Sequence, residues 1–211
     1  MRPVPVFLGL VLLGGSPGCS RLAYPFARAF GGPSEAELRA CRPAFERMKA
    51  GLPTAVFVVH PALVPKGPAG DPLPGTAERL AEGLRRLGAA QAQAQATPPE
   101  VAMTPLGRNQ MRFTWTRARA YGTWVRANHP PGDFHVFQEM LRSPDGVVRG
   151  MMLYVVESSG QVAFVSLWNS HHFEGGVAPA SPEAACDLML LRFRKSLTWD
   201  AQRMFPPYGI G

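Results

Sequence analysis

The chain contains little charge and no apolar run long enough to cross a membrane. Charged side chains account for 18% of the 211 residues, whereas apolar residues account for 46%. The apolar run at residues 4–13 is about half the length of a transmembrane helix, which needs about twenty residues. This apolar content excludes wholesale disorder, and the 22 prolines and 22 glycines indicate long ordered connections. We therefore expect a globular protein with several structured loops.

The sequence also lacks the common motifs of catalysis and nucleotide binding. Its one Gly-x-Ser-x-Gly match, at residues 14–18, lies within the apolar start of the chain and not between a predicted strand and helix, so it forms no nucleophile elbow. The sequence contains no His-Glu-x-x-His helix and neither of the two glycine-rich phosphate-binding patterns. These absences argue against a serine hydrolase, a zincin-type protease and a nucleotide-dependent enzyme. We expect no cofactor, and the leading interpretation is a protein without enzymatic activity.

The first nineteen residues have the pattern of an export signal. Arg2 precedes the apolar run Val4 to Leu13, and small residues lead into Cys19. This ending resembles the lipobox of bacterial lipoproteins, and the resemblance implies lipidation of Cys19 and cleavage in front of it. The alternative is an ordinary cleaved signal in which Cys19 carries no lipid. The expected organisation is a signal peptide at 1–18, a lipidated tether at 19–33 and a single globular domain at 34–211.

The compartment decides how the charge is interpreted. The formal net charge is +7, which in the cytosol would suggest nucleic acid. Behind an export signal, the available polyanions are lipid headgroups, envelope glycans and acidic proteins, so no nucleic-acid partner is expected. In Gram-negative lipoproteins, a residue other than aspartate after the cysteine implies the outer membrane, and here that residue is Ser20. A basic surface without any electrostatic partner is the other interpretation.

Hydrophobic periodicity predicts a mixed α/β fold. A capping box at Ser34 and Glu37 predicts a first helix to about residue 50, and Thr76 is expected to cap a second helix that ends at Gly88. Residues 109–128 fit both periods, but their length favours a helix. A last helix follows Ser181 and Pro182. Strands are expected at 54–60, weakly at 89–96, and in a three-stranded antiparallel meander at 134–142, 147–157 and 161–169. The elements predict a mixed sheet covered by helices.

This element order, behind a lipidated cysteine and a tether, resembles the envelope lipoproteins built on the TolB amino-terminal or curli-channel-lipoprotein type of domain. That group includes activators of peptidoglycan synthases. The resemblance rests on architecture over about residues 52–198 and transfers no functional residue. It implies a membrane-anchored protein with a non-enzymatic binding or accessory role, whose partner is an envelope protein or peptidoglycan.

Histidines provide the alternative function. His60 follows the first strand, while His171 and His172 follow the last, and imidazoles bind metals or move protons near neutral pH. If those strands run parallel, their ends meet at one edge of the sheet, where Glu174 and Asp145 could join them. His135, at the start of its strand, is expected at the opposite edge. The alternative prediction is therefore a metal-binding protein or metal-assisted hydrolase that uses His60, His171 and His172.

Two further sets of residues are candidates. Arg112, Arg119 and Arg126 lie seven residues apart on the 109–128 helix, where they form either a polyanion-binding face or a plain solvated stripe. Cys41 and Cys186 form an even pair once Cys19 is lipidated, and each lies on the apolar stripe of its helix. In an oxidising compartment they are predicted to form a disulfide, with two separate buried thiols as the alternative.

Overall fold

The computed structural model describes residues 34–61, 75–95, 101, 110–129, 132–142, 148–169 and 181–198. Cys19 and the predicted signal and tether lie outside these ranges. The described elements follow the predicted order closely. They are α2 (Glu35–Gly51), β1 (Val56–Pro61), α3 (Thr76–Arg86), β2 (Gln91–Ala94), α4 (Gln110–Asn128), β3 (Phe134–Arg142), β4 (Val148–Glu157), β5 (Val162–Asn169) and α5 (Pro182–Leu197).

The five strands form one mixed sheet in the order β2-β1-β3-β4-β5. β1 pairs in parallel with both β2 and β3, whereas β3, β4 and β5 form the antiparallel meander expected from their two-residue alternation. The Ala-Gln segment is a short edge strand, as its weak pattern predicted. The α/β fold class is therefore confirmed.

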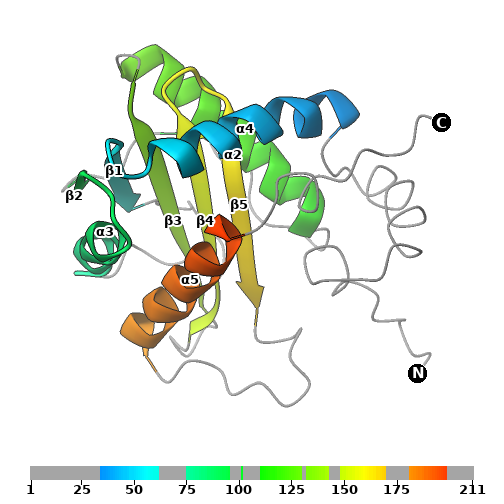
Figure 1. Ribbon diagram of the computed structural model, residues 1–211. Helices are drawn as coiled ribbons and strands as arrows, with labels where there is room; N and C mark the ends of the chain where they lie inside the picture. The colour runs from blue at the N-terminus through cyan, green and yellow to red at the C-terminus, as the bar shows by residue number, and fades with distance from the viewer. Residues whose placement is uncertain are drawn as a thin grey trace, which may run out of the picture.

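Helices cover both faces of the sheet (Figure 1). The viewer's side carries α2 and α5, with α3 beside them over β1 and β2, and α4 crosses the far face. This division follows from strand alternation, because neighbouring residues of a buried strand point to opposite faces. On β3, Gln138 contacts α5 through Cys186, whereas Glu139 contacts Arg117 of α4. Both faces of β3 are consequently core.

The helix ends show where local sequence signals were sufficient. Ser34 and Glu37 form the predicted capping box at the start of α2, and the Ser181 hydroxyl accepts a hydrogen bond from the backbone N–H of Ala184 at the start of α5. The expected cap at Thr76 is wrong. Gly75, with a φ of 81°, is the N-cap of α3 and provides no side-chain bond, while Thr76 is the first helical residue and is buried. The positive φ is a conformation that glycine adopts without steric cost.

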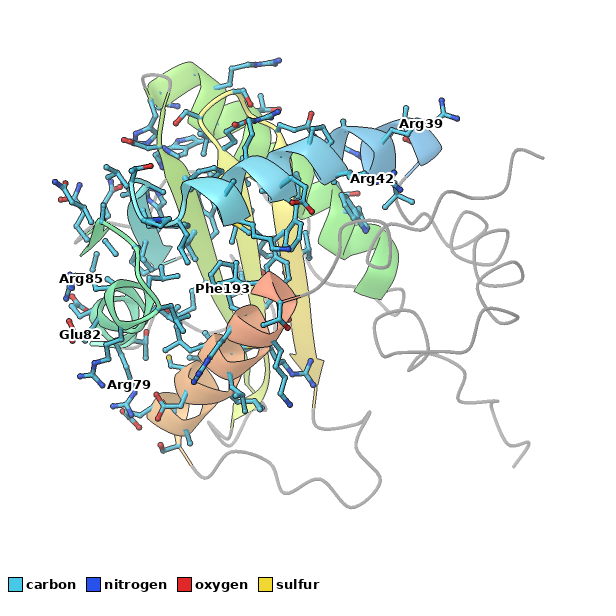
Figure 2. The ribbon with its side chains drawn as sticks, viewed as in Figure 1. Arg39, Arg42, Arg79, Glu82, Arg85 and Phe193 are labelled. Atoms are coloured by element: carbon cyan, nitrogen blue, oxygen red, sulfur yellow. The ribbon has the colours of Figure 1, made fainter. Side chains whose placement is uncertain are left out.

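Two ion pairs lie on the surface of α3, one within the helix and one between α3 and α5. Arg85 pairs with Glu82 along the helix at 2.6 Å, and Arg79 reaches Asp187 on α5 at 2.6 Å. Figure 2 shows Arg79, Glu82 and Arg85 pointing outward from α3, whereas Phe193 of α5 points toward the sheet, where it packs against Phe164. Within the described ranges, no helix is sufficiently long and apolar to span a bilayer.

Candidate metal centre

Three histidines meet between α4 and the sheet. His60 is the penultimate residue of β1, His135 is the second residue of β3, and His129 directly follows α4. One ring nitrogen of each lies within 4.8 Å of the corresponding atoms of the other two. His60 Nε2 and His135 Nδ1 are 2.9 Å apart, which is a hydrogen-bond distance, so one of these two rings carries the proton between them.

The strand register brings His135 to His60, so its expected place at the opposite edge is wrong. β1 is six residues long, and it pairs with the first part of the longer β3. His60 therefore lies opposite Phe137 and only two positions from His135, on the same face of the sheet. The prediction for His135 was wrong because the position of a residue within its own strand does not show where a shorter neighbouring strand ends.

His60 does not lie near the end of β5. β5 runs in the same direction as β1, as the alternative function required, but β3 and β4 separate the two strands. Three strand spacings amount to about 14 Å. In addition, β1 ends opposite Gln138 in the middle of β3, well before the end of the sheet. His171, His172, Glu174 and Asp145 lie outside the described residues.

The surroundings keep all three imidazoles neutral. Burial, assisted by repulsion from the neighbouring histidines, lowers the pKa of His60 to about 3 and that of His135 to about 4. Burial also lowers the pKa of the half-exposed His129, although Asp133 opposes the effect. At neutral pH each ring therefore retains a nitrogen lone pair, which is the form that coordinates a metal ion.

Each of the three rings has a nitrogen without a hydrogen-bond partner in the described part of the chain. These atoms are His60 Nδ1, His129 Nε2 and His135 Nε2. Apart from the His60–His135 bond and the Gln95 side chain next to His60, the rings are held by aromatic contacts. Trp124 lies 5.4 Å from the His60 ring and 4.9 Å from the His129 ring, and Phe137 stacks on His60 at 4.7 Å. The cluster is thus a set of oriented but incompletely bonded nitrogens in an aromatic environment.

A second polar group occupies the other end of the same interface. The buried Glu139 carboxylate accepts hydrogen bonds from Arg117 Nη1 at 2.5 Å and from the Tyr121 hydroxyl at 2.7 Å. Tyr121 also stacks on Phe137, the residue between His135 and Glu139 on this face of β3. Arg117 was not among the residues predicted from the sequence, because it does not belong to the exposed series of Arg112, Arg119 and Arg126. The alternation of His135, Phe137 and Glu139 on one strand face was the signal that could have revealed a polar interior.

No protein-family model and no curated protein sequence matches this chain.

The predicted disulfide is absent. Cys41 and Cys186 are both free and buried. Cys186 contacts Gln138 and the Thr76 carbonyl oxygen, whereas Cys41 faces the turn between β4 and β5 near Gln161. The two helices cover different parts of one sheet face, so a shared apolar orientation does not make the thiols neighbours. Burial raises the pKa of each thiol to about 12, so neither is poised as a nucleophile.

The arginine stripe is only partly an open cationic face. Arg119 and Arg126 are exposed on α4, as expected, but Arg119 is engaged by the carboxylate of Glu37 from α2. Arg112 lies in α4, and its side chain is outside the described part. Of the two members whose side chains are described, Arg126 is the one on α4 that has no carboxylate partner among the described residues.

Proposed function

We propose that the folded domain binds a transition-metal ion, of which Zn²⁺ is the best fit, through His60, His129 and His135. The observation that carries this proposal is the convergence of three neutral imidazoles from three separate elements, with their ligand atoms within 4.8 Å. Three imidazoles leave a further position for water, as in catalytic zinc sites. The proposal retains the metal-binding alternative from the sequence but replaces His171 and His172 with His129 and His135.

The energetics support a ligand for these nitrogens. A buried polar atom without a partner costs about 1–3 kcal/mol, and His60 and His135 each bury one such atom. Apolar side chains would fill the same space between Trp124 and Phe137 without this cost. A metal ion that coordinated these unpartnered nitrogens would convert unfavourable burial into coordination.

The donor set narrows the choice of metal. Imidazole nitrogens suit zinc, copper and nickel, whereas calcium and magnesium require oxygen ligands. The three residues of the cluster provide no carboxylate or thiolate, and the described cysteines lie in other parts of the fold. A borderline divalent ion such as Zn²⁺ therefore matches the cluster best.

Calorimetric titration of the metal-free full chain with Zn²⁺ tests this proposal. We expect one ion per chain, and a stabilisation of about 2.7 kcal/mol when free Zn²⁺ is 100 times the dissociation constant. His129→Ala is the preferred variant because its ring is half-exposed and packs at the margin of the core. It should weaken binding at least about 100-fold, the upper end of what loss of an outer-shell partner costs.

His171→Ala/His172→Ala is the matched control, because it removes two histidines and leaves the proposed ligands intact. Its affinity for Zn²⁺ should equal that of the unaltered chain. The proposal fails if the unaltered chain does not bind Zn²⁺, or if His129→Ala binds with undiminished affinity. Loss of binding in the control variant alone would restore the original assignment to His60, His171 and His172.

We further propose that the chain is an exported protein of the cell envelope, held on the outer membrane through lipidated Cys19 and facing the periplasm. The support is the charged start, the short apolar run and the small residues before Cys19. Multiple acyl chains give durable anchoring, whereas a single short chain binds only marginally. In a native membrane preparation, Cys19→Ala should move the protein to the soluble fraction. An intact mass that shows unmodified Cys19, or cleavage elsewhere, would contradict the anchor.

On such an anchor, a metal-binding domain would serve as a binding or accessory component of the envelope. A protein or peptidoglycan partner remains the expectation from the architectural resemblance. Crosslinking in the native envelope, followed by identification of the attached molecule, distinguishes these two partners.

A further inference from the structure

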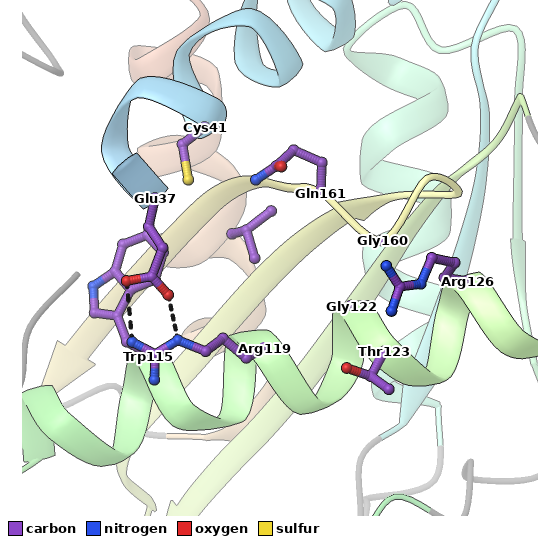
Figure 3. A pocket seen from close by; sticks show the side chains of 10 residues that line it. Glu37, Cys41, Trp115, Arg119, Gly122, Thr123, Arg126, Gly160 and Gln161 are labelled. Carbon is purple, nitrogen blue, oxygen red and sulfur yellow. Dashed lines mark hydrogen bonds and ion pairs between the residues drawn. The ribbon is translucent and has the colours of Figure 1, made fainter. Parts of the chain in front are cut away.

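A groove of about 300 Å³ lies along α4, on the side where the helix meets the start of α2 and the turn between β4 and β5 (Figure 3). Trp115 and the Arg119–Glu37 ion pair stand at one end, and Arg126 stands at the other. Gln161 and Cys41 lie between them on the opposite wall. The groove is separate from the histidine cluster, and none of the three histidines lines it.

Two glycines fix the floor of the groove. A Cβ atom at Gly122 of α4 would lie 2.3 Å from the carbonyl oxygen of Gly160, and one at Gly160 would lie 2.7 Å from the carbonyl oxygen of Gly122. Gly160 also has a φ of 85°, which few other residues adopt. The backbone of the helix therefore rests directly on the turn, and this contact holds Arg126 and Gln161 in a constant relation.

The charges in the groove are already partly matched. The Arg119 guanidinium, through its hydrogen bonds, holds the pKa of Glu37 at about 2, so that pair remains ionised and closed at neutral pH. In the described part of the chain, neither the Arg126 guanidinium nor the Gln161 side-chain amide has a hydrogen-bond partner. Among its described lining residues, the groove thus presents one guanidinium and one side-chain amide without partners, and the indole of Trp115 as a wall.

This arrangement selects for a ligand with a single negative charge. An arginine fork binds carboxylates and phosphates alike. However, a phosphate monoester carries a charge of about −1.5 to −2 at neutral pH, which one free guanidinium beside the Glu37 carboxylate would not balance. A carboxylate carries one charge and matches Arg126 alone. The free amide of Gln161 complements the N–H and C=O of a peptide bond.

We propose that the groove binds the carboxyl-terminal end of a peptide, with the carboxylate on Arg126 and the chain running past Gln161 toward Trp115. Trp115 and Arg126 are eleven positions apart on α4, which corresponds to about 16 Å along the helix. An extended peptide of about four or five residues covers that distance. The indole of Trp115 provides an apolar surface for the far end of the ligand.

Nuclear magnetic resonance titration of the full chain with acetyl-tetra-alanine, and with the same peptide amidated at its carboxyl end, tests this site. The free acid should shift the signals of the groove, and the amide should bind at least about tenfold more weakly, because it lacks the charge-assisted bonds. Arg126→Gln should abolish the difference between the two peptides. Arg126→Lys should restore only part of it, since an ammonium lacks the fork geometry.

Arg86→Gln is the matched control. It removes an equally positive side chain that is 77% exposed on α3, outside the groove. The proposal is overturned if the acid causes no shifts at about 5 mM, a concentration that reveals millimolar affinities. It is also overturned if both peptides bind equally, or if inorganic phosphate competes more strongly than the acid. Zn²⁺ binding should be identical in Arg126→Gln and the unaltered chain, so the two sites fail or succeed independently.

Discussion

The buried ion pair beneath α4 makes the strongest prediction about stability. Arg117 and Glu139 have side-chain exposures of 1% and 0%, and the Tyr121 hydroxyl provides the second bond to the carboxylate. Replacement of Arg117 by Met preserves most of the apolar volume and removes the positive charge. Glu139 then remains buried with one neutral donor. Removal of one partner from a buried pair typically costs about 3–5 kcal/mol, because the other charge is left uncompensated.

The loss should be large enough to measure directly. For a chain of this size, 1 kcal/mol corresponds to about 2–4 °C in the melting temperature, so Arg117→Met should lower it by roughly 6–20 °C. Urea unfolding at pH 8 gives the free energy. The double variant Arg117→Met/Glu139→Met removes both charges, and buried pairs replaced by apolar residues are often neutral or even more stable. It should recover most of the loss.

The penalty in Arg117→Met should also depend on pH. Burial raises the pKa of Glu139 above its ordinary value of 4.5, while Arg117 opposes this effect. Without Arg117, the pKa in the folded state rises further. The folded state then binds a proton that the unfolded state has released, so stability falls as the pH rises above about 4.5. The deficit of Arg117→Met should be greatest at pH 8 and smaller near pH 5.

The double variant should lack this additional pH dependence, since it has no carboxyl at position 139. Arg86→Gln, an exposed charge change, should alter stability by less than about 0.5 kcal/mol. The reasoning is refuted if Arg117→Met costs under about 1 kcal/mol, or if the double variant is less stable than the single one.

Three further results are expected. Gly122→Ala should destabilise the fold by about 1–3 kcal/mol in urea unfolding, because its Cβ would meet the Gly160 carbonyl oxygen at 2.3 Å; an unchanged midpoint would contradict the close contact. Native protein should protect Cys41 and Cys186 from alkylation, and unfolding without reductant should expose both as free thiols, whereas a bridged pair would refute the structure. Glu37→Gln should lower the free energy of unfolding by about 1 kcal/mol at neutral pH. Because the pKa of Glu37 in the folded state is about 2, its contribution to stability should be complete above pH 4.5 and lost as the pH falls through 2. Unfolding of both proteins at a series of acidic pH values checks this.

Most elements of this protein could be predicted from local sequence. The capping box at Ser34, the Ser181-Pro182 start of α5 and the alternation from β3 to β5 depend on neighbouring residues and on one period each. Length decided the helix at 110–128, where both periods fitted. Such signals depend on interactions between residues that are close along the chain, so they can be recognised without knowledge of the fold.

The sequence by itself thus determined the order of the elements, the mixed α/β class and the caps of α2 and α5. The tertiary structure alone decided which polar residues meet. Register placed His60 opposite Phe137 and beside His135, and the end of α4 added His129. The same docking of helices kept Cys41 away from Cys186 and buried Arg117 against Glu139. These contacts depend on where a short strand ends and how far a helix extends, and both are set by packing across the sheet rather than by spacing along the chain.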